Sequence, residues 1–214
     1  MYLPPQFQAS DRALAIDLMR AHSFASLIST DDEGLPFVTH LPLVVEEHAD
    51  GALSLLGHCA KPNPHGRHLR ARPRAVAMFQ GPHAYMSPAV YPDLARVPTW
   101  NYLAVHCTVE ARLIEGPDAK EGLLKRLIAE HEPAYAQQWD GIDPVLQHKL
   151  LAGIVGFELR VVAWQCKLKL NQHRPESHAA LHARYAAGTP DERALAGWME
   201  RLGMAASDAV GAGA

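Results

Sequence analysis

The sequence has no uncharged apolar run long enough to cross a membrane, because its longest runs reach about half of the roughly 20 residues that a transmembrane helix needs. The N-terminal segment also lacks the basic and apolar regions of a secretory signal peptide. Cysteine is scarce: Cys59, Cys107 and Cys166 are an odd number and widely separated, which is typical of reduced thiols and not of a disulfide framework. These absences predict a cytoplasmic protein.

The composition that remains is that of a globular chain. Of 214 residues, 48% are hydrophobic and 20% are charged, which excludes a disordered chain and permits a sizeable core. This length predicts one domain with an appendage more often than two domains.

The acidic residues are unevenly distributed. The formal net charge is −3, yet no Asp or Glu occurs from Gly51 to Pro92. The same segment contains five cations, namely Lys61, Arg67, Arg70, Arg72 and Arg74. A local excess of positive charge attracts an anion, either a phosphate group or a nucleic-acid backbone, although it is also compatible with a solvated basic face.

Short apolar or alternating runs between turn signals predict a chain made mainly of β-strands. The expected strands are 24–29, 36–45, 52–59, 74–80, 83–86, 103–113 and 156–170, with Gly81-Pro82 as a turn. The run 103–113 alternates strictly between apolar and other residues, which is good evidence for a half-buried strand. The apolar phase of 156–170 slips by one residue, which predicts a β-bulge near Val162.

Helical patterns are fewer and lie mostly late in the chain. They occur at 11–21, with Ser10 as the expected N-cap, at 118–131, and at 144–152. Residues 176–202 predict two short helices separated at Gly188-Thr189-Pro190. We therefore expect a mainly β, α+β protein: a β-barrel domain over 1–175 with a helical insertion near 118–152, followed by a helical extension over 176–214.

The segment from Gly57 to His65 contains a chemically suggestive loop. It follows a buried strand, and its prolines stiffen a turn that presents Lys61 in a defined direction, as a phosphate site requires. An ordinary hairpin loop with a solvated lysine is equally compatible with this spacing. His58, Cys59, His65 and His68 match no familiar zinc-ligand spacing, so no metal site is expected.

Two further segments, 79–88 and 97–102, are dense in aromatic, amide and hydroxyl side chains. A flat heteroaromatic ring such as isoalloxazine needs apolar faces to stack on and a few donors and acceptors at its edge. Buried corners of a barrel, where Gly and Pro bend the chain, are the alternative interpretation.

Several motifs in fixed order resemble the PaiB family of FMN-binding negative transcriptional regulators. They are the opening Met1-Tyr2-x-Pro4-x-x-Phe7, then His40-Leu41-Pro42-Leu43, Gly57-His58-x-Ala60-Lys61-x-Asn63-Pro64, the run 78–88, Pro98-Thr99-Trp100-Asn101-Tyr102, and Lys167-Leu168-Lys169-Leu170-x-Gln172. The resemblance implies an FMN-binding split β-barrel with peripheral helices and a C-terminal helical hairpin. It further implies a homodimer with the flavin at the subunit interface.

The resemblance also implies which side chains contact the flavin. Thr39, His40, His58, Lys61 and Asn63 are expected at the phosphate and ribityl chain, and Tyr85, Ser87, Trp100, Asn101, Tyr102, Lys169 and Gln172 complete the expected cofactor site. The chain departs from the family pattern at four positions, namely Gly66, Val90, Asn171 and His173. The family leads us to expect an aromatic residue at or near Gly66 and another at or near Val90. It also leads us to expect a small hydroxyl residue in place of Asn171 and an amide in place of His173.

Two other functions stay open on the sequence alone. One is a flavin reductase-like oxidoreductase that acts on a small molecule with a nicotinamide cofactor, for which no proton donor can be named. The other is DNA binding, favoured by the basic stretch and the C-terminal helix pair. Asp191, Glu192 and Glu200 on the second of those helices argue against it, since a recognition helix normally presents donors.

Overall fold

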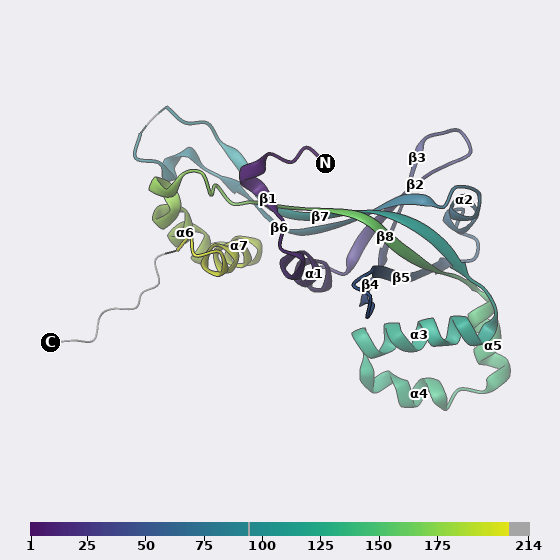
Figure 1. The fold of residues 1–214 in the computed structure, drawn as a ribbon. Helices are drawn as coiled ribbons and strands as arrows, with labels where there is room; N and C mark the ends of the chain where they lie inside the picture. Colours follow the sequence, from purple (N-terminus) through teal and green to yellow (C-terminus); the bar gives the residue numbers. More distant parts are fainter. Residues whose placement is uncertain (94, 206–214) are drawn as a thin grey trace. The chain divides into compact units, whose positions relative to one another are not determined.

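A computed structural model describes residues 1–93 and 95–205 (Figure 1). Its strands are β1 (Gln8–Ala9), β2 (Phe24–Thr30), β3 (Pro36–Pro42), β4 (Val44–Glu47), β5 (Leu53–Ala60), β6 (Arg74–Met86), β7 (Thr99–Ile114) and β8 (Ile154–Lys169). Its α-helices are α1 (Arg12–Ala21), α2 (His65–Ala71), α3 (Pro117–His131), α4 (Ala136–Asp140), α5 (Pro144–Ala152), α6 (His178–Ala186) and α7 (Pro190–Arg201). The strands form one sheet in the order β3-β2-β6-β7-β8-β5-β4, with β1 paired to β8. The mainly β, α+β prediction is confirmed.

Two local predictions were wrong. The expected turn at Gly81-Pro82 is absent, because β6 continues through both residues, and both are buried. Packing in the sheet overrides their local turn preference. The N-cap of α1 is Asp11 and not Ser10, since the Asp11 carboxylate accepts a hydrogen bond from the amide of Ala13 at 2.8 Å.

The phase slip in the last long strand is visible in the burial of β8. Phe157 and Leu159 are buried in its first half, whereas Cys166 and Leu168 are buried in its second half. Between them, Val162 and Ala163 are both exposed, so the buried face changes from odd to even residues there. The first half pairs with β5, and Cys166 and Lys167 pair with β1.

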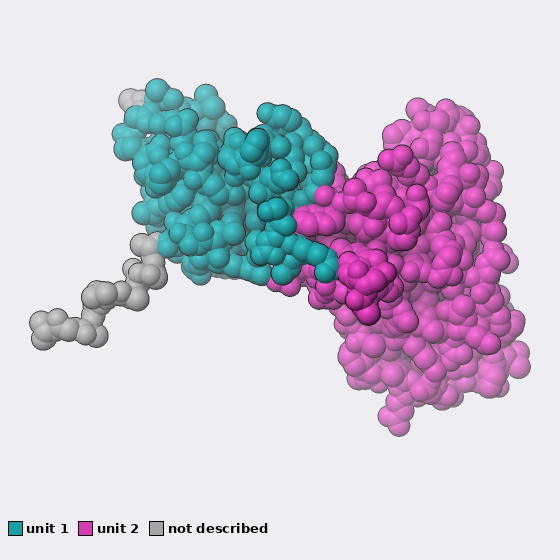
Figure 2. All heavy atoms as spheres, viewed as in Figure 1, with its two compact units in different colours: residues 1–14, 80–104, 165–214 teal, residues 15–79, 105–164 magenta. Residues whose placement is uncertain are grey.

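The chain divides into two compact units (Figure 2). Unit 1 comprises residues 1–14, 80–104 and 165–214, and unit 2 comprises residues 15–79 and 105–164. Since β6, β7 and β8 each pass from one unit into the other, every unit is built from segments distant in the sequence.

Unit 2 contains β2 to β5 and the helical insertion. Antiparallel pairing joins β2 to β3 and β6, and joins β5 to β4 and β8. Leu123 and Leu127 of α3 pack on Val44 and Leu56 of the sheet. A second cluster, built on Ile128, Trp139 and Leu151, holds α3, α4 and α5 together, and Figure 1 shows these three helices as one group. The predicted helical insertion is therefore a structured part of this unit.

Unit 1 contains the predicted helical hairpin, α6 and α7. Thr189 caps α7 through a capping box, in which its hydroxyl accepts from the Glu192 amide and the Glu192 carboxylate accepts from the Thr189 amide. Leu181 and Tyr185 of α6 and Leu195 and Met199 of α7 are fully buried. The break predicted at Gly188-Thr189-Pro190 is confirmed.

Two expectations from composition can be compared with the structure. The three cysteines are buried, and no disulfide joins them in the described part of the chain. Among the described residues, no helix is long and apolar enough to cross a membrane.

Candidate functional site

The loop that follows β5 is tied to β3 by side-chain hydrogen bonds. The Thr39 hydroxyl accepts from Asn63 Nδ2 at 3.2 Å and lies 2.8 Å from His65 Nδ1. Asn63 Oδ1 accepts from the amide of His65 at 2.9 Å. At the other end of the loop, the amide of Lys61 donates to the carbonyl of Gly153 at 2.8 Å. The loop 61–63 is thus fixed from both sides, as the prolines in its sequence predict.

His65 and His68 lie beneath this loop, at the start of α2. Both are buried, with exposed fractions of 0% and 3%, and both contact the ring of Phe37 edge-on at 5.3 and 4.8 Å. Burial, with a smaller contribution from His68, lowers the pKa of His65 to about 4. His65 is therefore neutral at pH 7, and it supports the loop without adding charge.

Gly57 and His58 lie just before the loop, within β5. A Cβ atom at Gly57 would lie 2.7 Å from Leu43 Cδ2 and 3.1 Å from Phe157 Cε2, so only glycine fits at this point of the strand. The Nδ1 atom of His58 is buried and has no hydrogen-bond partner among the described residues. Burial also lowers the pKa of His58 below its ordinary value. An unpartnered ring nitrogen next to a fixed loop is suited to a ligand group.

Lys61 is exposed and lines two small cavities of about 220 and 200 Å³. Gly116 and Lys120 line both of them. The Lys120 ammonium is already bonded to the carbonyls of Leu151 and Ile154. Lys61 is thus the cation of this loop that a phosphate can reach.

Thr39 and His40 do not face the same side of the sheet. Thr39 points to the buried side with Asn63 and His65, whereas His40 is exposed, stacks on Phe24 and bonds Ser26 Oγ at 3.0 Å. Successive residues of a strand point to opposite faces, which separates this pair. The structure brings Thr39 together with Asn63, and it places His40 elsewhere.

Three residues expected in the cofactor site lie in unit 1 and are called the aromatic group: Tyr85, Trp100 and Tyr102. Trp100 and Tyr85 meet edge-to-face at 6.2 Å and are 54% and 45% exposed. The ring of Tyr102 lies 5.1 Å from Lys167 Nζ and 6.0 Å from Lys169 Nζ. This group offers open aromatic faces with positive charge beside them.

Two other residues expected to contact the flavin form hydrogen bonds with the backbone of unit 1. Ser87 caps a short 3₁₀ turn by accepting from the amide of Ala89, and Gln172 bonds the backbone of Leu168 and Leu170. Asn101 is fully buried on the opposite face of β7 from Trp100 and Tyr102.

Sequence reasoning did not assign His65, His68 or Phe37 to the site. The histidines were considered only as metal ligands, and within the described residues no group of three or more His, Cys, Asp or Glu is placed to hold an ion. The signal that could have found His65 is its position two residues after Asn63, where an Asn side chain commonly caps the following backbone.

Two departures from the family pattern have structural reasons. A Cβ at Gly66 would lie 3.0 to 3.3 Å from the side chain of Val155, so an aromatic residue does not fit there. Asn171 has a left-handed backbone with φ of 70°, which asparagine tolerates better than most residues. Its side chain donates to Ser177 Oγ and accepts from the Tyr91 hydroxyl.

Comparison with known proteins shows the family of this chain. Residues 1–163 match the family described as "Putative FMN-binding domain". This chain belongs to that FMN-binding family. A relative from Bacillus subtilis, "Protease synthase and sporulation protein PAI 2", is 36% identical over 83% of this chain and 84% of its own length. The resemblance to the PaiB family is therefore confirmed, and so is FMN as the cofactor of the family.

Solved structures share the fold of this FMN-binding chain at low sequence identity. The flavocytochrome Anf3 from Azotobacter vinelandii has a TM-score of 0.61 and 17% identity, with 76% of this chain and 69% of that one covered. The FAD and heme binding protein from Mycobacterium smegmatis has a TM-score of 0.57 and 19% identity, with 76% and 73% covered. The split-barrel fold class is confirmed by this likeness.

Proposed function

We propose that the FMN phosphate is held at the loop 61–63 of unit 2, by Lys61 and the ring nitrogen of His58. A phosphate monoester carries close to two negative charges at neutral pH, so a lysine on a loop with a fixed backbone suits it. The supporting observation is the hydrogen-bonded anchor formed by Thr39, Asn63 and His65, which fixes the loop before any ligand arrives. A pre-ordered site loses little entropy on binding.

His58, which lies in β5 just before this loop, also fits the cofactor. His58 Nδ1 is buried, and no described residue is its hydrogen-bond partner, and a buried polar atom left unpaired costs about 1–3 kcal/mol. A phosphate or ribityl oxygen would satisfy it. In this proposal Thr39, Asn63 and His65 position the loop and do not contact the phosphate themselves.

We further propose that the protein is a homodimer whose interface includes the exposed face of β2 and β3. Phe24 is 70% exposed and Val38 is 45% exposed, and Ile28, Val76 and Met78 lie half-buried on the same face by their pairing registers. A row of apolar side chains on a sheet face is typical of a surface that another chain covers. His40 belongs to this face.

In the proposed homodimer, the aromatic group of Trp100, Tyr85 and Tyr102 would contact the isoalloxazine ring of the FMN whose phosphate the other copy holds. FMN, when bound, supplies hydride and electron transfer. Because Trp100 and Tyr85 remain exposed, the ring edge would stay open to a second reactant, which favours an FMN-dependent oxidoreductase as a second candidate function. Consumption of NADH or NADPH by the flavin-loaded protein tests that candidate against a protein that only binds FMN.

DNA binding has less support than FMN binding or an oxidoreductase activity. Asp191 and Glu192 occupy the first turn of α7, and Glu200 near its end bonds His182. An acidic helix surface repels the phosphate backbone.

The phosphate site is tested by Lys61→Ala, with Arg67→Ala as the matched control from the same basic segment. Arg67 is paired with Asp32 at 2.9 Å and lies outside the loop. We expect Lys61→Ala to weaken FMN binding about tenfold or more, measured by flavin fluorescence, with the melting temperature of the flavin-free protein unchanged. FMN retention equal to that of Arg67→Ala would show that Lys61 is not the phosphate ligand.

A further inference from the structure

Unit 1 contains a cavity of about 420 Å³, and two of its lining residues, Asn101 and Lys169, are ones for which the family resemblance implies flavin contact. It lies where β7 and β8 meet the turns that surround them, and its lining includes Phe7, Tyr91, Asn101, Lys169 and Arg174. No Asp or Glu is among the described residues that line it. A volume of this size is in the range of small-molecule sites.

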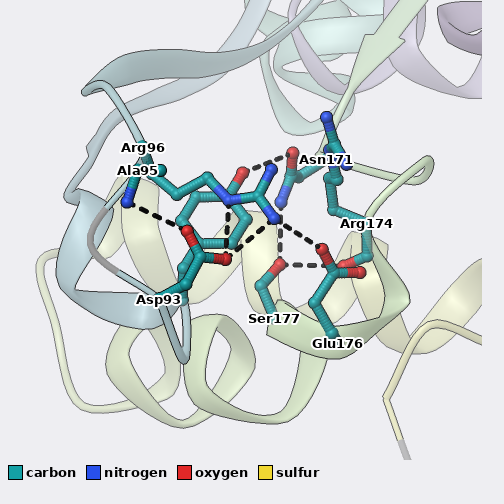
Figure 3. Close-up of polar contacts among 8 residues, drawn as sticks. Asp93, Ala95, Arg96, Asn171, Arg174, Glu176 and Ser177 are labelled. Carbon is teal, nitrogen blue, oxygen red and sulfur yellow. Dashed lines mark hydrogen bonds and ion pairs between the residues drawn. The ribbon is translucent and has the colours of Figure 1, made fainter.

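The cations of this cavity are available for a ligand. Lys169 Nζ donates to the hydroxyl of Thr99 at 2.6 Å, and neither Lys169 nor Arg174 forms an ion pair with a carboxylate in the described part of the chain. Arg96 differs, since Asp93 holds it at 2.9 Å and Glu176 at 3.5 Å (Figure 3). Lys169 and Arg174 are therefore the lining cations outside any ion pair of the described residues, with Asp93 within electrostatic range of Arg174, and their charge favours an anion.

The Arg174 main chain is held in place independently of its guanidinium. The Ser177 hydroxyl donates to the Arg174 carbonyl at 2.9 Å, and Asn171 Nδ2 donates to Ser177 Oγ at 2.8 Å (Figure 3). These bonds fix the turn after β8. The side chain of Arg174 projects from a rigid backbone, which is what a built site requires.

Asn101 supplies the second feature of the cavity. It is 0% exposed, and its Nδ2 donates to the Tyr185 hydroxyl at 3.1 Å. The Tyr185 hydroxyl lies 3.5 Å from the carbonyl of Tyr85, and Asn101 Nδ2 also donates to Met86 Sδ at 3.6 Å. Asn101 Oδ1 is left buried with no partner among the described residues, so it requires a donor.

We propose that this cavity binds a small organic acid that has a flat apolar body and one hydroxyl or N–H group. Its carboxylate would pair with Lys169 and Arg174, and its donor would satisfy Asn101 Oδ1. Phe7 and Tyr91 provide the aromatic walls for the body of the ligand. The site lies wholly within unit 1, and this proposal assigns Asn101 and Lys169 to the acid and not to the flavin.

The probe is 4-hydroxybenzoate, whose binding is measured by calorimetry on the full chain, both loaded with FMN and free of it. Benzoate lacks the donor, and 4-hydroxybenzyl alcohol lacks the negative charge. We expect 4-hydroxybenzoate to bind about tenfold or more tightly than either analogue. Binding of benzoate with the same affinity, or no saturable binding of 4-hydroxybenzoate at millimolar concentration, would overturn the proposal.

Arg174→Gln tests the assigned cation, with Arg184→Gln as the matched control. Arg184 lies in α6 of the same unit, is exposed and does not line the cavity. We expect Arg174→Gln alone to weaken binding of the acid about tenfold, with FMN absorbance unchanged. An equal effect of both variants, or loss of FMN together with the acid in Arg174→Gln, would overturn the proposal, the latter by showing that the cavity belongs to the flavin site.

Discussion

Thr39 Oγ1 lies 2.8 Å from His65 Nδ1 and joins the middle of β3 to the start of α2. The same hydroxyl accepts from Asn63, so one oxygen holds the C-terminal end of the loop proposed to bind the FMN phosphate. None of the three side chains carries charge at pH 7, because the pKa of His65 is lowered to about 4 by burial. A neutral network fixes the loop without competing for the phosphate.

Thr39→Val retains the shape of the side chain and removes this oxygen. We expect the free energy of unfolding to fall by about 1–3 kcal/mol, because Asn63 and His65 each lose a partner. We expect FMN binding to weaken as well, since the loop is no longer pre-ordered. Urea unfolding and flavin fluorescence measure the two effects. Thr39→Ser should restore both, and a Val variant as stable as the parent would contradict the role of the hydroxyl.

The stability of the protein should decrease as the pH falls from 7 to 5. Unfolded His65 takes up a proton near its ordinary pKa of 6.5, whereas the folded side chain stays neutral down to about pH 4. The unfolded state then binds more protons than the folded state, so acid favours unfolding. Urea midpoints measured at pH 7 and pH 5 report this dependence.

The contribution of His65 is separated from that of the other histidines by substitution. His65→Gln should show a smaller decrease between pH 7 and pH 5 than the parent protein, while His131→Gln, at the exposed end of α3, should match the parent. If all three proteins have the same pH dependence, His65 does not titrate as its burial implies.

Gly57→Ala should destabilise the fold by about 1–3 kcal/mol, because the added methyl would overlap Leu43 and crowd Phe157. Gly122→Ala is the matched control. Gly122 lies in α3 with no atom within 4 Å of the added methyl, so this change should raise stability by about 0.5–1 kcal/mol through helix propensity. Thermal unfolding distinguishes the two, and a neutral Gly57→Ala would show that β5 can shift to make room.

Val38→Lys should convert the proposed dimer into a monomer, because it places a charge in the middle of the exposed apolar face of β2 and β3. Leu35→Lys is the control, since Leu35 is 57% exposed but lies in the turn before β3. Light scattering after size-exclusion chromatography gives the mass of each. A monomeric parent protein, or a Val38→Lys variant that stays dimeric, would rule out this face as the interface.

Much of the fold could be predicted from local patterns. The strict alternation of 103–113 lies within β7, and the break predicted at Gly188-Thr189-Pro190 falls between α6 and α7. These elements follow from burial at a fixed period and from capping, which depend on residues close together in the sequence. Gly81-Pro82 resisted prediction because its environment in β6 comes from distant segments.

The candidate site was predicted in part. The motif from Gly57 to Asn63 indicated a fixed loop, and the structure shows the bonds that fix it. The motif did not indicate His65, whose burial under the loop depends on the packing of α2 against β3.

The sequence by itself determined the family, the β-rich class, the loop with its lysine and the C-terminal helix pair, since short motifs and local periodicity carry each of them. Only the tertiary structure decided that Thr39 and His40 face opposite sides, that Asn101 is buried with a free acceptor, and that Lys169 and Arg174 line one cavity. Those relations arise where segments far apart in the chain pack together, and no local pattern encodes which partners meet.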